Sequence, residues 1–254
     1  MSILLVCNRF IELLSQLSLR QREPRPVSEK LTMGERAYEL IAHRIVSGRL
    51  PPGLKLKPDD LREDLQLGTS PIREALLRLA SEGLVGMHGQ RGFYVPQVTE
   101  EDLLDIAMVR TRLSVWALEM AIEKGDSDWE ASIVAAFHKM QFLMKRVIDD
   151  PQAHFEEWEK LNAAFHRALE SACGSPLLLR FLQIAYARSE RYRRHFVRYP
   201  DLLPKAQEEH KEIMDAALAR DTIRATDALR THIQSGIDVV LAAMRRRKAA
   251  SVQA

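Results

Sequence analysis

The sequence predicts a mainly α-helical protein, in which an N-terminal winged helix-turn-helix domain is followed by an all-helical antiparallel bundle of about six helices. Two observations predict this order. Helical periodicity covers most of the chain from residue 32 onward, whereas short β-prone runs occur only within residues 84–96. We therefore divide the chain into four parts: an N-terminal arm (1–31), the winged domain (32–97), the bundle (98–245) and a tail (246–254).

The composition of the 254 residues, of which 46% are hydrophobic, is typical of a globular protein with buried cores. The two cysteines, Cys7 and Cys173, lie far apart, so the sequence predicts neither a disulfide framework nor a zinc ribbon. Arg9 interrupts the apolar N-terminus, and no apolar run reaches the roughly 20 residues that span a bilayer. We expect a cytoplasmic protein that does not associate with membranes.

Three helices and a hairpin are expected in the winged domain. The first helix starts near Thr32 and ends at the turn SGRLPPG, and the second covers PDDLREDL. In the third, TSPIREALLRLASEG, Ser70 is a good N-cap, Pro71 suits the first helical position and Gly83 favours the C-terminal end. The segment LVGMHGQRGFYVP then predicts a hairpin with glycine in its turn.

The third helix presents Thr69, Ser70 and Arg73 away from its buried stripe. In a winged helix this element lies in the major groove, so Arg73 can reach a guanine edge or a phosphate and the two hydroxyls can reach the DNA backbone. His88 and Gly89 at the hairpin tip can enter the minor groove. From spacing alone a solvated helix face is the simpler explanation, because residues 31–97 carry nine Lys/Arg against eight Asp/Glu.

The motifs SPIREALLRLASEGLV and HGQRGFYV resemble the DNA-binding domain of GntR-family bacterial repressors over about residues 33–97. The resemblance implies that Ser70, Arg73 and the tip formed by His88 and Gly89 contact double-stranded operator DNA. Family members often have Arg where this chain has Thr69, and that Arg helps to read the operator. The operator sequence therefore does not carry over from the family.

Buried histidines recur on three of the expected bundle helices. Asn162 and His166 lie four residues apart beside the apolar stripe of EEWEKLNAAFHRALE, and His210 and His232 fall at the centre of the stripes of two later helices. One buried histidine is more often a core residue than a ligand, whereas three of them together with an asparagine favour a metal site. Neutral imidazoles and an oxygen ligand suit a divalent ion such as Zn²⁺ or Ni²⁺.

Arg110 lies on the apolar face of the first bundle helix, where an unpaired guanidinium is costly to bury. Its partner is either an internal carboxylate or an anionic ligand, and the sequence leaves both open. Ser189 and Tyr192 add two inward-facing hydroxyls from another helix. Together with the metal, these residues predict a polar pocket for a small organic acid.

The bundle resembles the FCD effector domain of the FadR subfamily, whose metal-binding members carry [DN]-x-x-x-H, then E-H-x-x-I, then a histidine in the last helix. The resemblance implies that Arg110 faces the effector and that four residues bind the metal: Asn162, His166, His210 and His232. Two positions depart from the family pattern, since Asn162 replaces the commoner Asp and Ser114 replaces a usual Glu. Motifs such as DSDWEA and SERYR are most similar to regulators of the CsiR type, which govern short dicarboxylate and 4-aminobutyrate-related catabolism.

Three functions are compatible with these predictions. The first is a ligand-responsive repressor that binds operator DNA as a homodimer and has no enzymatic activity. The second is a metal-dependent hydrolase, but we expect no general acid or base beside the histidines, because Glu208 and Glu209 lie on other faces of the helix that carries His210. The third, a helical interaction module, would leave the winged domain unexplained.

Overall fold

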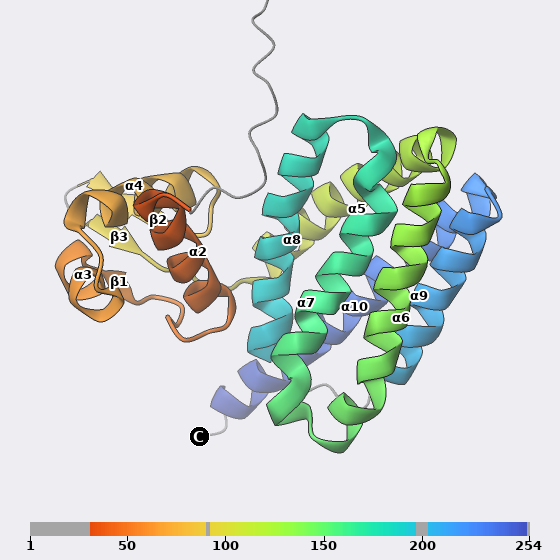
Figure 1. The fold of residues 1–254 in the computed structure, drawn as a ribbon. Helices are drawn as coiled ribbons and strands as arrows, with labels where there is room; N and C mark the ends of the chain where they lie inside the picture. The colour runs from red at the N-terminus through yellow and green to blue at the C-terminus, as the bar shows by residue number, and fades with distance from the viewer. Residues whose placement is uncertain (1–30, 90–91, 197–202, 253–254) are drawn as a thin grey trace, which may run out of the picture. The chain divides into compact units, whose positions relative to one another are not determined.

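The computed structural model describes residues 31–89, 92–196 and 203–252 of the chain. Over these residues it confirms the predicted fold class, a winged helix-turn-helix domain followed by a helical bundle (Figure 1). The expected N-terminal arm lies outside the described residues, apart from its last residue, Leu31.

The winged domain contains three helices and a small antiparallel sheet. The elements are α2 (Met33–Val46), β1 (Lys55–Leu56), α3 (Pro58–Leu65), α4 (Thr69–Ser81), β2 (Gly86–His88) and β3 (Gly92–Tyr94). The strand order is β1-β3-β2, and Phe93 of β3 pairs with Leu56 on one side and with Met87 on the other. Strand β1 was not expected, because two residues are too short to show the alternation that predicts a strand.

The apolar faces of α2, α3 and α4 meet in one hydrophobic core. Its fully or nearly fully buried members include Ile41, Ile45, Leu61, Ile72, Leu76 and Leu79. Burying the periodic stripe of α4 in this core leaves the opposite face of the helix exposed, as the sequence predicted.

Helix α4 begins earlier than expected. Its N-cap is Gly68 in an extended conformation, so the predicted N-cap at Ser70 is wrong, and Ser70 and Pro71 both lie inside the first turn. Glycine is an acceptable N-cap, and Pro71 costs nothing there because the first turn has no intrahelical partner for its N–H groups. The backbone N–H groups of Thr69 and Ser70 therefore point out of the N-terminal end of the helix.

The C-terminal end of α4 is as predicted. Gly83 has a φ of 77°, in the left-handed region where glycine is not strained. The N–H of Leu84 donates to the carbonyl oxygen of Leu79 at 3.0 Å, which is the pattern of a glycine-terminated helix.

The bundle has six α-helices over the described residues, as predicted. They are α5 (Glu100–Lys124), α6 (Ser127–Asp149), α7 (Pro151–Glu170), α8 (Pro176–Phe196), α9 (Leu203–Leu218) and α10 (Thr222–Val252), with a 3₁₀ turn at Ser171–Cys173. Helix α10 continues past residue 245, so the expected tail at 246–254 is helical through Val252.

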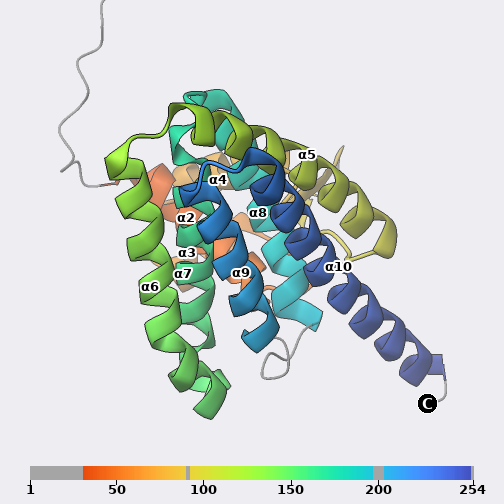
Figure 2. The same ribbon diagram turned by 90° about the vertical axis from the view of Figure 1, so that its right-hand side faces the viewer.

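Side-chain caps set the starts of the first three bundle helices. Thr99, Asp126 and Asp150 accept hydrogen bonds from backbone N–H groups three residues later, at 3.1, 3.0 and 3.1 Å. These caps start each helix close to the end of the previous one, which keeps the connections short. Helix α6 packs on α7, which follows it in the chain, and α5 packs on α8 and α10. Figure 2 shows α9 between α6 and α10, in contact with both.

The core of the bundle holds an unusual share of polar side chains among its apolar residues. Arg110, Asn162, His166, Ser189 and His210 are each at most 6% exposed. These residues come from four helices, α5, α7, α8 and α9, so the bundle itself positions the candidate site. Among the described helices, none combines the length and the apolarity needed to cross a membrane.

Candidate functional site

The exposed face of α4 carries the residues predicted to read DNA. Ser70 and Arg73 are exposed, Thr69 is half-buried, and Leu77 continues the same face with 53% of its surface exposed. Thr69, Arg73 and Leu77 lie four residues apart, so they form one row along the helix. The positive end of the α4 dipole lies at the start of this row.

The hairpin places the other predicted DNA contacts at the end of β2. His88 and Gly89 are exposed, and the imidazole of His88 stacks on the ring of Tyr94, with centroids 5.2 Å apart and planes 12° apart. Gly89 has open space around it, because an added Cβ would meet no atom within 4 Å. The next two residues, 90 and 91, lie outside the described part of the chain.

In the bundle, three histidines from three helices meet. His166 of α7, His210 of α9 and His232 of α10 each offer a ligand atom, and these atoms all lie within 4.8 Å of one another. The ring centroids of His210 and His232 are 4.3 Å apart, and that of His166 lies 5.3 and 5.2 Å from them. The positions of the histidines placed each of them on a buried stripe, and the resemblance to the FCD domain implied that they converge.

The environment keeps the three imidazoles neutral. Burial, followed by the neighbouring imidazoles, lowers the pKa of His166 well below its ordinary value. Burial and His232 do the same to the pKa of His210, and burial lowers the pKa of His232 although the carboxylate of Glu209 opposes it. Neutral imidazoles are the form that binds metal ions.

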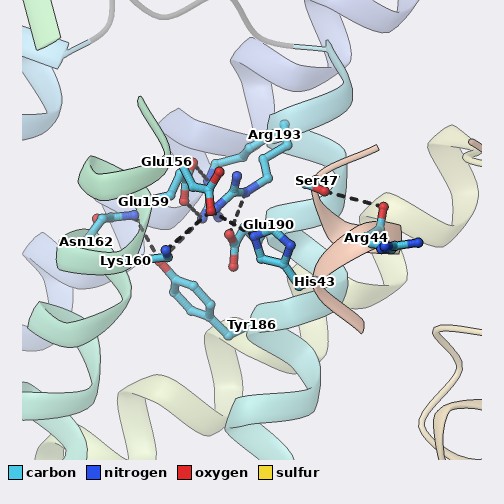
Figure 3. Close-up of polar contacts among 11 residues, drawn as sticks. His43, Arg44, Ser47, Glu156, Glu159, Lys160, Asn162, Tyr186, Glu190 and Arg193 are labelled. Atoms are coloured by element: carbon cyan, nitrogen blue, oxygen red, sulfur yellow. Dashed lines mark hydrogen bonds and ion pairs between the residues drawn. The ribbon is translucent and has the colours of Figure 1, made fainter. Parts of the chain in front are cut away.

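Asn162 is held by a polar chain on the same side of the bundle (Figure 3). Its amide nitrogen donates to the hydroxyl of Tyr186 at 2.9 Å, which leaves its Oδ1 buried and without a partner. The Tyr186 hydroxyl also accepts from Arg193 at 3.3 Å, and Arg193 forms an ion pair with the fully buried Glu159 at 2.9 Å. Burial raises the pKa of Tyr186 to about 12, so it stays protonated.

Arg110 is buried as predicted, with 6% of its surface exposed. Its Nη1 donates to Ser189 Oγ at 3.1 Å, and its guanidinium lies over the ring of Tyr186, 4.8 Å from the centroid. Its Nε is buried and has no hydrogen-bond partner, and among the described residues no carboxylate is paired with it. Glu170 and Glu159 act on it only at longer range.

One cavity of about 140 Å³ brings most of the predicted residues together. Its polar lining includes predicted residues from five helices: Arg110, Asn162, His166, Ser189, His210 and His232. Sequence reasoning missed four further polar residues that line it: Arg193, Lys205, Glu209 and Ser235. Helical spacing could have indicated two of them, since Arg193 follows Ser189 by four residues and Ser235 follows His232 by three.

Tyr192 does not reach this cavity, and its predicted place in the pocket is corrected. The residue is buried on α8, but its hydroxyl donates to Asp102 Oδ2 at 2.6 Å and accepts from the backbone N–H of Thr99 at 3.2 Å. The long side chain carries the hydroxyl away from the face on which its Cα lies, toward the start of α5. Tyr192 therefore stabilises the beginning of the bundle.

Glu209 corrects the expectation that no carboxylate lies beside the histidines. Its Oε2 is 2.9 Å from Nδ1 of His232, and its side chain is 16% exposed. Glu208, by contrast, is exposed. Adjacent residues on a helix point about 100° apart, so His210 faces the cluster while Glu209 reaches sideways to α10.

Comparison with known proteins finds two family models, which match separate parts of the chain. A family model described as bacterial regulatory proteins, gntR family, matches residues 33–95, and one described as the FCD domain matches residues 105–235. The HTH-type transcriptional regulator BphR of Paraburkholderia xenovorans (strain LB400) is 38% identical over 223 residues, which cover 88% of this chain and 91% of BphR.

Two further relatives come from Escherichia coli. The HTH-type transcriptional repressor GlaR of strain K12 is 32% identical over 211 residues, which cover 82% of this chain and 95% of GlaR. The solved structure of McbR/YncC matches with a TM-score of 0.72 at 23% identity, over 84% of this chain and 98% of that one. The latter likeness shows a shared fold.

Proposed function

Because the chain belongs to the GntR family of bacterial transcriptional regulators, in the FadR subfamily that carries an FCD domain, we propose that it is a ligand-responsive repressor. It binds operator DNA as a homodimer and senses a small carboxylate through a divalent metal in the bundle. The observation that carries this proposal is the buried meeting of three neutral histidines, Asn162 and Arg110 in one cavity. The repressor name of GlaR supports the direction of regulation.

The donor atoms of the cavity fit a metal ion. Asn162 Oδ1, His166 Nε2 and both ring nitrogens of His210 are buried and have no hydrogen-bond partner among the described residues. Unpaired buried polar atoms are costly, and a divalent ion would satisfy them together. Three imidazole nitrogens and an amide oxygen suit Zn²⁺ or Ni²⁺. When bound, such an ion supplies a Lewis-acidic position for a carboxylate oxygen.

Arg110 and Ser189 supply the second half of carboxylate recognition. The guanidinium has an unused Nε and no paired carboxylate, so an anionic ligand would complete its hydrogen bonds. Ser189 fixes the orientation of the guanidinium through Nη1. The cavity volume of about 140 Å³ limits the effector to a small molecule.

The homodimer uses the outer face of α5. Leu104, Met108 and Trp116 lie on this face at multiples of four residues and are 48%, 59% and 56% exposed. A second copy of the chain is the partner, because helix-turn-helix proteins read two half-sites with paired heads. Covering this row removes large apolar side chains from water.

A metal-dependent hydrolase is the alternative that the Glu209 contact favours. Hydrolysis needs a base that faces the open coordination position. Glu209 instead contacts His232 through Nδ1, and the guanidiniums of Arg110 and Arg193 line the cavity. This arrangement suits anion binding better than activation of water, so we propose a sensor without enzymatic activity.

The experiment that tests the proposal measures metal content and ligand stabilisation together. The protein is purified without chelators, its metal content is determined by mass spectrometry, and thermal shifts are recorded with carboxylates of four to six carbons. We expect near-stoichiometric metal and carboxylate stabilisation in the wild type, and loss of both in His210→Ala. His138→Ala, an exposed histidine on α6, is the matched control and should behave as the wild type.

Two results would contradict the proposed metal-carboxylate mechanism. If the wild type contains no divalent metal after incubation with Zn²⁺ or Ni²⁺ and no carboxylate shifts its melting temperature, the metal-carboxylate mechanism is wrong. Loss of metal in His138→Ala as well as in His210→Ala would also contradict it, because the loss would then not be specific to the cluster.

A further inference from the structure

The three clustered histidines differ in what holds them. Among the described residues, His210 has no hydrogen-bond partner at either ring nitrogen, and His166 has none at Nε2. His232 does have a side-chain partner in this part of the chain, because its Nδ1 lies 2.9 Å from Oε2 of Glu209. Both side chains are largely shielded from water, at 13% and 16% exposed.

This contact fixes the state of the His232 ring. A carboxylate can only accept a hydrogen bond, so Nδ1 must carry the hydrogen. In a neutral imidazole the other nitrogen, Nε2, then holds the lone pair. The ring cannot turn over without breaking the bond to Glu209. His232 is therefore left with one nitrogen, Nε2, to present to a metal.

Glu209 is itself not in a position to be a ligand. Among the described residues, the histidine, cysteine and acidic side chains that could hold an ion at this place are His166, His210 and His232. The second oxygen of Glu209 lies 3.7 Å from Nζ of Lys205, which also lines the cavity. The carboxylate therefore contacts His232 through one oxygen and faces Lys205 with the other.

We propose that Glu209 is a positioning residue for the metal site, which orients His232 and makes its Nε2 a stronger donor. The inference rests on the proposed function, since it concerns the same ion. Carboxylates hydrogen-bonded to metal-binding histidines hold the ring orientation and increase ligand basicity, and their removal weakens metal binding by about 10- to 100-fold. Two consecutive residues of α9 then serve the site, His210 as a ligand and Glu209 as the support of a ligand on α10.

The test measures affinity for Zn²⁺ by competition with a chromophoric chelator, and the visible absorption spectrum of the Co²⁺-loaded protein. We expect Glu209→Ala to bind Zn²⁺ about 10- to 100-fold more weakly than the wild type and to change the Co²⁺ bands. Glu209→Gln should lose less affinity, because its amide oxygen can still accept from Nδ1. Glu208→Ala is the matched control from the adjacent, exposed position and should equal the wild type.

The outcomes separate this inference from the proposed function. If the wild type binds Zn²⁺ and Glu209→Ala binds it within about twofold of the wild type with an unchanged Co²⁺ spectrum, the inference is wrong and the metal site stands. If the wild type binds neither ion, both are wrong. If Glu209→Ala does not fold, Glu209→Leu decides, because leucine keeps most of the side-chain bulk but cannot accept from Nδ1: a shifted Co²⁺ spectrum and weaker Zn²⁺ binding support the role, and wild-type values overturn it.

Discussion

At the scale of single residues, the charge of Arg110 is opposed by a carboxyl group that is only partly ionised. Ser114 stands one turn after Arg110 and supplies no charge, and the buried carboxyl group of Glu170, at the end of α7, acts on Arg110 through its charge. Burial raises the pKa of Glu170 to about 7, although the hydrogen bond from Ser114 and the charge of Arg110 act in the opposite direction. Near neutral pH, Glu170 is therefore only partly charged, and we expect it to compete weakly with the proposed effector for Arg110.

This pKa predicts a stability that depends on pH. The unfolded chain has the ordinary value of 4.5 and the folded protein about 7, so the folded state holds the proton more tightly. Stability is therefore lost as pH rises through this window, by up to about 3 kcal/mol. Glu170→Gln keeps a hydrogen-bonding group without the charge, and we expect it to gain stability relative to the wild type between about pH 5 and about pH 8.

The measurement is denaturant unfolding of the metal-free protein across this pH range. Glu123→Gln, an exposed carboxylate on α5, is the control and should follow the wild type at every pH. A constant difference between Glu170→Gln and the wild type at all pH values would show that Glu170 has an ordinary pKa in the folded protein.

At the residue scale, helical periodicity predicted which face of a helix carries each residue. It did not predict where the polar end of a long side chain lies. His166, His210 and His232 came together because short, stiff rings stay close to the face on which their Cα atoms lie. Tyr192 and Glu209 were misjudged for the same reason, since their polar ends lie well away from the Cα. The pairing of such ends depends on the neighbouring helix, which the sequence does not place.

At the scale of elements, long periodic helices were predictable and short or terminal features were not. The six bundle helices were expected from sustained helical periodicity, whereas β1 has two residues and left no pattern. The N-cap of α4 was misplaced because Gly68, Ser70 and Pro71 are all compatible with a helix start. This error matters for function, since Ser70 then lies inside the first turn that we propose faces DNA.

The same element gives a prediction for DNA binding. Arg73 is exposed on the row of α4 that begins at Thr69, so Arg73→Ala should weaken binding to an operator by about 1–3 kcal/mol if Arg73 contacts a base. If it contacts a phosphate instead, the slope of log affinity against log salt should fall by about one. Binding is measured by fluorescence anisotropy at several salt concentrations, on duplexes that the wild type selects from a random library.

Lys139→Ala is the control for this experiment, because Lys139 is an exposed cation on α6 of the bundle, away from the proposed dimer face of α5. It should leave both the affinity and the salt slope unchanged. Equal binding by Arg73→Ala and the wild type would mean that Arg73 belongs to a solvated helix face and does not contact the operator.

At the scale of the whole molecule, the two hydrophobic cores follow the order of the sequence, one in residues 37–95 and one in residues 103–244. Each core is built from consecutive elements, which is why the division into a winged domain and a bundle was predictable. Some large apolar residues belong to neither core. Trp116, for example, is 56% exposed on α5, whose other face is buried. This exposed surface is the one that we propose as the interface with a second copy of the chain.

The proposed dimer through α5 predicts the behaviour of one substitution. Trp116 borders a hollow with Val115, Arg112 and Glu119, and aromatic residues in such places dominate interface energies. Trp116→Glu should raise the dimer dissociation constant by about 30-fold or more, because it removes the apolar contact and adds a charge that the interface would have to bury. Sedimentation equilibrium gives the constant, and circular dichroism shows whether the fold is kept.

Phe142→Glu separates this interface from a general effect of surface charge. Phe142 is 69% exposed on α6, so its substitution removes as large an apolar side chain from a different face. Phe142→Glu should leave the dimer intact, whereas folded Trp116→Glu should be monomeric at the same protein concentration. The monomer should lose affinity for an operator with two half-sites and keep its weak binding to a single half-site. If folded Trp116→Glu remains a dimer, or if Phe142→Glu is a monomer, the interface lies on another face. The α5 face would then not be the surface that joins the two DNA-reading domains and strengthens operator binding.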